Sequence, residues 1–407
     1  MSALKLVVVF LLIVLALRHK LSVGITLFGA GLVTAVLYKV SLSSLAQGYW
    51  ELVKSQRFLS LTSVIVLITA LGQLLKDLKF LERLAVACRG LPGGSRTAVA
   101  VMPPLVGLMP MPGGALLSAP LVGNVLTSPG YPSELKTVSN YWFRHVVEFF
   151  WPIYPGLILT EAITRLSIGR VSLMQFPLTV VMTMLGLVFF IRKIDNRHDG
   201  EPKLWPSIWG IMKTIWPIAL AIALYGILKI ELALAVLLAF VSLSIFARPR
   251  KEILLGAIRK ALSYKLVFLV FGTLSFQTAL ELSGAVKSIP ELSLALHLPK
   301  EVVIFSVCFG IGILTGMVAA YVGLGYSLLA GFLYQPQVVP SAILLAFFSG
   351  YLGMILSPTH LCLILSNEYF GSDLLKAYRL MAVPVILLAA FGLSLYFSPW
   401  ASLFGPR

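Results

Sequence analysis

The sequence has few charged residues. Asp, Glu, Lys and Arg together make up 12% of its 407 residues, whereas a soluble domain has roughly 25%. Hydrophobic residues account for 58%, and the mean hydropathy is +0.94. Apolar runs such as 7–17 and 178–191 are continuous, unlike the alternating segments of an outer-membrane barrel. The composition therefore excludes a soluble globular protein and indicates an all-α polytopic membrane protein surrounded by the lipid bilayer.

Cysteine and recognisable catalytic motifs are also scarce. Cys88, Cys308 and Cys362 have no C-x-x-C spacing and no nearby histidine cluster, so we expect packing residues, no disulfide framework and no metal site. There is no HExxH, GxSxG, Walker-type loop or carboxylate dyad, and the run from His145 to Glu148 lacks a second histidine at the spacing zinc requires. These absences argue against an enzyme, and we expect no cofactor other than a coupling Na⁺ or H⁺.

Acidic residues are half as numerous as basic ones. The sequence has 16 Asp and Glu and 32 Lys and Arg, which gives a net charge of +16. The basic residues lie in short loops between apolar segments and form no continuous face, which argues against nucleic-acid binding. If the loop 18–20 is cytoplasmic, most basic residues fall on the cytoplasmic side, as the positive-inside rule requires. We therefore expect a multi-pass protein of the inner (cytoplasmic) membrane with both termini external.

The apolar segments form two similar series, which predict a duplicated architecture. Each series contains two helices, an amphipathic stretch, a third helix, a re-entrant hairpin, a proline-broken helix and a closing helix. Five crossings per series is an odd number, so the second repeat is expected to be inverted. The predicted units are repeat 1 (1–195, with hairpin 97–127 and broken helix 138–164), a cytoplasmic linker (196–206) and repeat 2 (207–407, with hairpin 301–333 and broken helix 338–366). The amphipathic stretches are 41–58 and 248–265.

Each predicted hairpin is broken by glycine and each following helix by proline. Backbone freed inside a membrane must line packed protein or a water-filled site, because lipid cannot satisfy it. A matching pair of such breaks is typical of a secondary transporter's substrate site. Glycine lets backbone approach a ligand, and a helix start favours an anion. The candidate substrate-binding residues are Gly113, Gly114, Ser118, Gly323, Gly325, Ser327, Ser357, Pro358, Thr359 and His360.

The few ionisable residues within the predicted spans cluster before the first proline break. Arg144 and Glu148 are four residues apart and could pair on one helix face. They are either a structural ion pair or a functional site. His145 and His360 could carry a coupling proton or could be packing residues. Carbonyl groups freed around Trp151 by Pro152 and Pro155, next to Tyr154, are suited to Na⁺.

Two strings carry a resemblance to known families: Met-Pro-Met-Pro-Gly-Gly at 109–114 and Ser-Pro-Thr-His-Leu-Cys-Leu at 357–363. With the overall pattern they resemble the ion transporter superfamily of gluconate, lactate, citrate and C4-dicarboxylate carriers, and locally the prokaryotic domain-of-unknown-function family 401. The resemblance implies that the paired hairpins and broken helices form the substrate and ion sites, which adds Pro112 to the candidates. It also implies a homodimer and an elevator-like motion. The Ser-Asn-Thr motif of the dicarboxylate and citrate carriers is replaced here by Gly-Gly and Ser-Pro-Thr-His.

These features favour a secondary active transporter. The expected cargo is a small organic anion of the carboxylate type, coupled to Na⁺ or H⁺ by alternating access. Two alternatives remain open from the sequence. One is a channel or exporter for a neutral solute, and the other is a membrane receptor that transports nothing.

Overall fold

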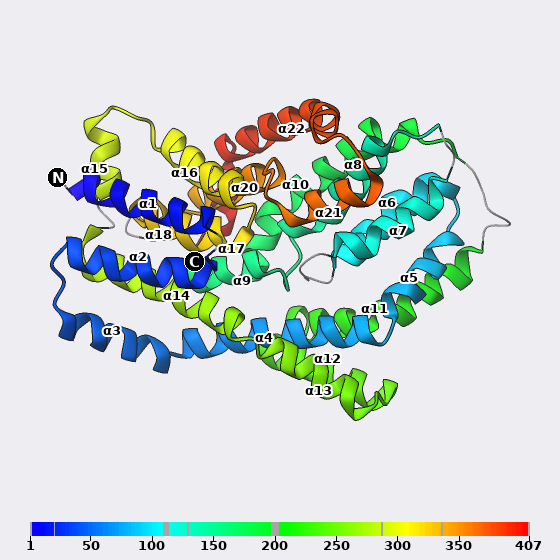
Figure 1. The fold of residues 1–407 in the computed structure, drawn as a ribbon, viewed down its shortest axis with the longest axis horizontal. Helices are drawn as coiled ribbons and strands as arrows, with labels where there is room; N and C mark the ends of the chain where they lie inside the picture. Colours follow the sequence, from blue (N-terminus) through cyan, green and yellow to red (C-terminus); the bar gives the residue numbers. More distant parts are fainter. Residues whose placement is uncertain are drawn as a thin grey trace.

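The structure is a computed structural model that describes residues 2–19, 21–108, 114–127, 130–196, 203–285, 288–334 and 337–405. Within these residues the chain is almost entirely helical, and β pairing is limited to an isolated bridge between Tyr334 and Val338. The helices form two layers (Figure 1). The hairpins and broken helices lie together in the upper layer of that view, and the helices that begin each half of the chain lie mainly in the lower one.

The first half of the chain, up to residue 193, has the predicted order of elements. Two helices and an amphipathic helix lead to a long helix, a short helix, the hairpin limbs, the broken helix and a closing helix. These are α1 (Ser2–Arg18), α2 (Val23–Leu37), α3 (Leu42–Lys54), α4 (Gln56–Asp77), α5 (Phe80–Arg89), α6 (Gly94–Gly107), α7 (Ala115–Val125), α8 (Ser133–His145), η1 (Val146–Phe149), α9 (Pro155–Thr164), α10 (Ile168–Phe189) and η2 (Ile191–Lys193).

The second half repeats this order. Its elements are α11 (Leu204–Gly226), α12 (Leu232–Ala247), α13 (Lys251–Ala261), α14 (Tyr264–Leu282), α15 (Ser288–Ala295), α16 (Lys300–Thr315), α17 (Val318–Ala320), the π-helical turn η4 (Tyr321–Gly325), α18 (Tyr326–Leu328), α19 (Ala330–Leu333), α20 (Pro340–Ile355), α21 (Leu361–Phe370), α22 (Leu374–Phe397) and η5 (Pro399–Phe404). The amphipathic stretches became α3 and α13, which bury only two residues each.

Local chemistry explains many of the helix boundaries. The side chains of Ser22, Ser41 and Ser55 accept backbone N–H bonds at the starts of α2, α3 and α4, which is the standard role of an N-cap serine. Pro155 and Pro340 occupy the first turns of α9 and α20, where proline loses no helical hydrogen bond. Pro155 thus restarts the helix at the first predicted break, and the second predicted break, at Pro358, lies between the end of α20 at Ile355 and the start of α21 at Leu361.

Four helices in the described part of the chain are long and apolar enough to cross a membrane without interruption: Gln56–Asp77, Ile168–Lys193, Leu204–Gly226 and Leu374–Phe397. Several shorter apolar helices accompany them, among them Val23–Leu37, Leu232–Ala247 and Pro340–Ile355. Unbroken helices of about 20 residues match the thickness of the hydrocarbon core. The chain is therefore a multi-pass membrane protein.

Contacts between the halves are reciprocal. Helix α2 packs against α14, and α4 packs against α12. Helix α7, the returning limb of the first hairpin, contacts α21, and α9 contacts α17 of the second hairpin. Where α2 crosses α14, the two helix backbones are in direct contact. A Cβ added to Gly24 would lie 2.4 Å from the carbonyl oxygen of Phe268. Each half thus completes the packing of the other.

Candidate functional site

The second hairpin turns at Gly316, the first of two glycine breaks in this segment, and not at 323–326, where we expected the tip. Helix α16 ends at Thr315, and Gly316 follows with φ +63° in the left-handed region. Glycine is the usual residue at such a helix end. The run 323–326, predicted as the tip, lies within the returning limb and includes the π-helical turn η4. Gly316, not this run, is therefore the residue that reverses the chain.

The glycines of the returning limb serve close packing. Gly323 lies against Thr273 of α14, where an added Cβ would approach to 2.8 Å, and Gly325 lies against Cys308 of α16 at the same distance. Ser327 is buried and donates its hydroxyl to the carbonyl oxygen of Gly323. The structure places these three predicted substrate residues against neighbouring helices and not at the turn.

The first hairpin is described on both sides of its tip. Pro112 and Gly113 lie outside the described residues. Gly114 begins α7, and an added Cβ there would lie 2.2 Å from a guanidinium nitrogen of Arg144. Ser118 is fully buried and donates to the carbonyl oxygen of Ala115 at 3.4 Å within its own helix. Only glycine at position 114 allows the Arg144 guanidinium to rest on this helix start.

Side chains at the first helix break bind the end of the first hairpin limb. The indole N–H of Trp151 donates to the carbonyl oxygen of Leu108 at 3.1 Å, and the hydroxyl of Tyr154 donates to that of Gly107 at 2.7 Å. The last four carbonyl groups of a helix have no partner within it. The break therefore completes the hydrogen bonding of α6.

The second break does the same for α16. The hydroxyl of Ser357 donates to the carbonyl oxygen of Ile313 at 2.7 Å, and that of Thr359 donates to Leu314 at 3.4 Å. Nδ1 of His360 lies 2.6 Å from the carbonyl oxygen of Gly316. Pro358 lies between these donors in the turn that restarts the chain as α21. The sequence predicted polar groups at both breaks but not that they bind the hairpins.

Two tyrosines join the broken helices to each other. The hydroxyl of Tyr141 in α8 donates to the carbonyl oxygen of Ile355 at the end of α20, at 3.0 Å. The hydroxyl of Tyr351 in α20 donates to the carbonyl oxygen of His145 at the end of α8, at 2.9 Å. Each tyrosine stands four residues before the carbonyl that its counterpart binds. All four groups are fully buried.

Replacing either tyrosine by phenylalanine is expected to lower the free energy of unfolding. Tyr141→Phe and Tyr351→Phe each leave a buried helix-end carbonyl without its donor, at a cost of about 1–3 kcal/mol. Tyr378→Phe is the matched control, because the buried Tyr378 hydroxyl has no hydrogen-bond partner. Thermal unfolding of the purified variants measures the difference. Equal melting temperatures for all three variants would show that the reciprocal bonds contribute nothing.

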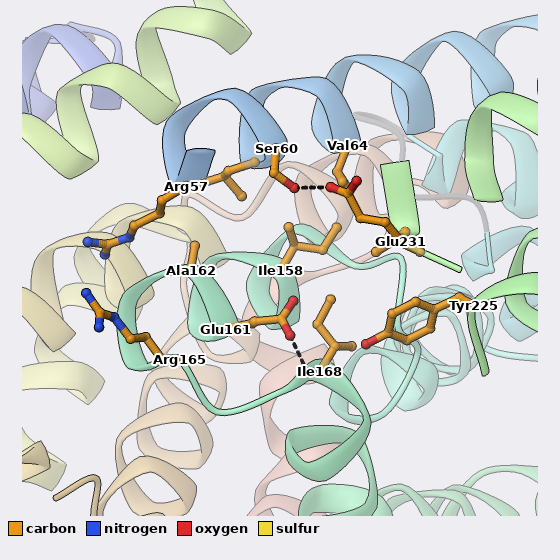
Figure 2. Close-up of a pocket in the computed structure, with 12 residues that line it drawn as sticks. Arg57, Ser60, Val64, Ile158, Glu161, Ala162, Arg165, Ile168, Tyr225 and Glu231 are labelled. Atoms are coloured by element: carbon orange, nitrogen blue, oxygen red, sulfur yellow. Dashed lines mark hydrogen bonds between the residues drawn. The ribbon is translucent and has the colours of Figure 1, made fainter. Parts of the chain in front are cut away.

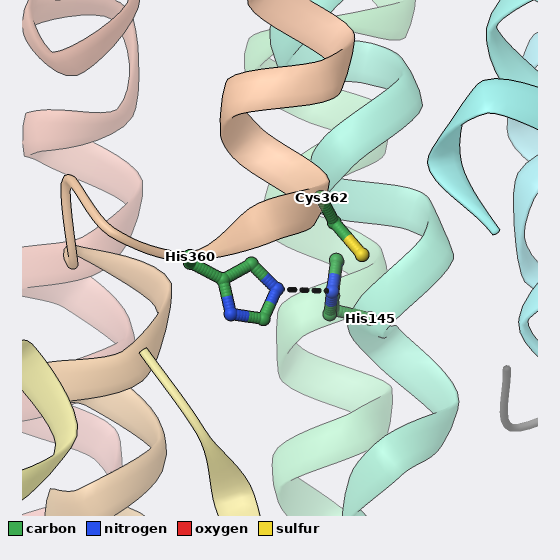
Figure 3. Close-up of side chains that lie close together, drawn as sticks. All are labelled: His145, His360 and Cys362. Atoms are coloured by element: carbon green, nitrogen blue, oxygen red, sulfur yellow. Dashed lines mark hydrogen bonds between the residues drawn. The ribbon is translucent and has the colours of Figure 1, made fainter. Parts of the chain in front are cut away.

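The two breaks meet at a pair of histidines (Figure 3). Nε2 of His145, at the end of α8, lies 3.0 Å from Nε2 of His360, just before α21. Cys362 is buried beside them, and one ring nitrogen of each histidine and the cysteine sulfur all lie within 4.8 Å of one another. The expectation that no histidines cluster near a cysteine was therefore wrong for Cys362, because the fold brings His145 to it from the other half of the chain.

Arg144 and Glu148 lie beside this pair and are both almost fully buried. Glu148 Oε1 is 3.7 Å from Nε2 of His145. The site thus combines one guanidinium, one carboxylate, two imidazoles and a thiol between the two hairpins.

A separate cavity of about 470 Å³, lined by both charged and apolar side chains, opens between α4, α9, α10, α11 and α12 (Figure 2). Arg57 and Arg165 point toward each other at one end of it, and Glu161 and Glu231 lie further along. Ser60 donates to Glu231 at 2.6 Å, and Glu161 accepts the N–H of Ile168 at 3.2 Å. Nothing in the local sequence indicates that Arg57 and Arg165 face one another.

Comparisons with known proteins agree with this architecture. The structure is similar to a crystal structure described as the YdaH transporter of Alcanivorax borkumensis, with a TM-score of 0.60 and 16% sequence identity, covering 90% of this chain and 91% of that one. No curated protein sequence matches the chain significantly. The model of the family described as "Protein of unknown function (DUF401)" matches residues 1–397. The chain therefore belongs to the DUF401 family.

Proposed function

We propose that this protein is a secondary active transporter that moves a small organic anion across the membrane, coupled to Na⁺ or H⁺ by alternating access. The observation that carries the proposal is the convergence of both broken helices and the Gly316 turn on one buried polar cluster. Interrupted helices that meet inside a membrane protein are the usual setting of a transporter's binding site. The similarity to the fold of a transporter supports the general class.

An anion suits the first hairpin. The start of α7 presents backbone N–H groups and the positive end of the helix dipole. The guanidinium of Arg144 lies against that start at Gly114, so a second positive group stands beside the helix end. A carboxylate could accept hydrogen bonds from both, and a bidentate guanidinium contact is especially favourable for such a group.

The hairpins and broken helices are the part proposed to move. They bind each other through Trp151, Tyr154, Ser357 and His360. The cavity of Figure 2 lies where α9 of this part meets α4 and α12, and it would give a solute access to that boundary. The motion would be an elevator-like slide of this part against the remaining helices.

The proposal is tested by reconstituting the purified chain in vesicles. Organic anions are first screened for thermal stabilisation of the protein, with Na⁺ and pH varied, because a ligand that binds the native state raises its stability. The best anion should then accumulate against its gradient only when an ion gradient is imposed. Downhill flux that never saturates would favour a channel, and no flux of any stabilising ligand would favour a receptor.

Arg165→Asn is expected to raise the KM for the anion about five- to tenfold, corresponding to roughly 1 kcal/mol. Arg165 is exposed at the cavity and has φ +60°, a conformation that asparagine tolerates, so folding should be unaffected. Lys229→Asn is the matched control, because Lys229 is also exposed with φ +56° but does not line the cavity. Uptake kinetics measure both variants. An equal KM for the two variants would show that the anion does not pass through the cavity.

A further inference from the structure

The histidine pair has a hydrogen-bonding pattern that neutral imidazoles alone do not satisfy. Nδ1 of His145 lies 2.6 Å from the carbonyl oxygen of Tyr141, and Nδ1 of His360 lies 2.6 Å from that of Gly316. A carbonyl oxygen only accepts, so each Nδ1 must carry the proton. A neutral imidazole has one N–H. Both Nε2 atoms therefore present lone pairs, and they do so to each other at 3.0 Å.

Further lone pairs surround this point. The sulfur of Cys362 belongs to the same group of close ligand atoms. Glu148 Oε1 lies 3.7 Å from Nε2 of His145, and Glu148 Oε2 is buried without a hydrogen-bond partner. Two imidazole nitrogens and a sulfur thus form one close centre with the Glu148 carboxylate beside it, and neither Nε2 can donate a hydrogen bond to the other. Such a centre is stabilised by a cation.

We propose that His145, His360 and Cys362 hold a zinc-class divalent transition metal ion in a tetrahedral site whose fourth position stays open, with the Glu148 carboxylate beside it. Imidazole, thiolate and carboxylate are the ligands that such ions prefer, whereas Na⁺ and Mg²⁺ prefer oxygen alone. Two nitrogens bound at about 2.0–2.1 Å to one tetrahedral ion lie roughly 3.3 Å apart, close to the 3.0 Å separation of the two Nε2 atoms.

The surroundings of the histidines also match those of metal ligands. Ligating histidines usually donate their other ring N–H to a carbonyl or carboxylate, which fixes the tautomer and orients the ring. Here Tyr141 and Gly316 supply those carbonyl groups, one from each half of the chain. The ion would bind only when the Cys362 thiol gives its proton to solvent, so each binding event should release a proton. The site joins the two helix breaks and does not depend on which solute is carried.

The test measures metal bound to the purified full-length protein. After exposure to Zn²⁺ and removal of excess ion, elemental analysis should find stoichiometric zinc in the wild type and in Cys308→Ser, whose cysteine is equally buried but lies in α16. Cys362→Ser and His360→Ala should bind at least about a hundredfold more weakly, since loss of even an outer partner costs roughly 10- to 100-fold. Co²⁺ loading of the wild type should give the charge-transfer absorption of a thiolate ligand, a readout that needs no variant.

Three outcomes would overturn the proposal. The first is a wild type that retains no Zn²⁺ or Co²⁺. The second is equal zinc binding by Cys308→Ser and Cys362→Ser. The third is a metal-free protein in which nitrogen-15 spectra show one proton shared between the two Nε2 atoms. Each result leaves the transport proposal standing, because the vesicle experiment is decided by anion accumulation and not by metal content.

Discussion

Gly316→Ala should remove transport and lower the free energy of unfolding by about 3 kcal/mol. Part of the loss, roughly 1–2 kcal/mol, is the cost of a left-handed backbone for a residue with a Cβ, since Gly316 has φ +63°. The rest is steric, because the new Cβ would lie 2.7 Å from the backbone nitrogen of His360 and 3.1 Å from the hydroxyl of Ser357. Backbone cannot move aside as a side-chain end can, so the turn and the break must separate.

Gly371→Ala separates the two contributions. Gly371 has φ +60°, almost the same backbone conformation, but nothing lies within 4 Å of the position its Cβ would take. This control should lose only the conformational cost and should keep transport. Thermal unfolding and vesicle uptake of both variants, measured together, decide the matter. Gly316→Ala protein with wild-type uptake would show that the contact between turn and break is not required.

Gly24→Val should prevent the chain from reaching a monodisperse folded state. At the crossing of α2 and α14, an added Cβ on Gly24 would stand 2.4 Å from the carbonyl oxygen of Phe268 and 2.7 Å from the nitrogen of Leu269. The crossing is equally tight from the other side, at Gly272. Small residues let membrane helices approach so closely that packing holds them together. Valine here would force apart helices from the two halves, a change beyond the 1–3 kcal/mol typical of core overpacking.

Gly29→Val provides the control on the same helix. An added Cβ on Gly29 meets nothing within 4 Å, and valine has the same helix propensity and hydrophobicity at both positions. Size-exclusion profiles in detergent and expression levels compare the two. If Gly24→Val elutes as the wild type does, the crossing is more adaptable than its geometry indicates.

The order of elements could be predicted because each one has a local cause. Apolar runs, proline restarts and amphipathic stretches carry their own sequence patterns, and α3, α13, α9 and α20 formed where those patterns lay. The position of the second turn could not be predicted. Gly316, Gly323 and Gly325 are equally able to reverse a chain, and the choice depends on tertiary packing: Gly323 and Gly325 pack against neighbouring helices, whereas Gly316 meets the second helix break.

The site was predictable residue by residue but not as an assembly. His145, Glu148 and His360 stood out as ionisable groups in apolar surroundings. The sequence could not predict that they lie together, because His145 and His360 are 215 residues apart and no local pattern encodes that contact. Cys362 was misread for the same reason. The packing of Arg144 on Gly114 likewise depends on how a hairpin from one segment docks on the next.

The exchange of tyrosine bonds between α8 and α20 has a consequence for producing the two halves separately. Tyr141 and Tyr351 each bind backbone that belongs to the other half, so either half produced alone would leave a helix terminus without its hydrogen bond in an apolar interior. The two halves are therefore expected to fold only together, and a change at either tyrosine acts on a helix end more than 200 residues away in the sequence.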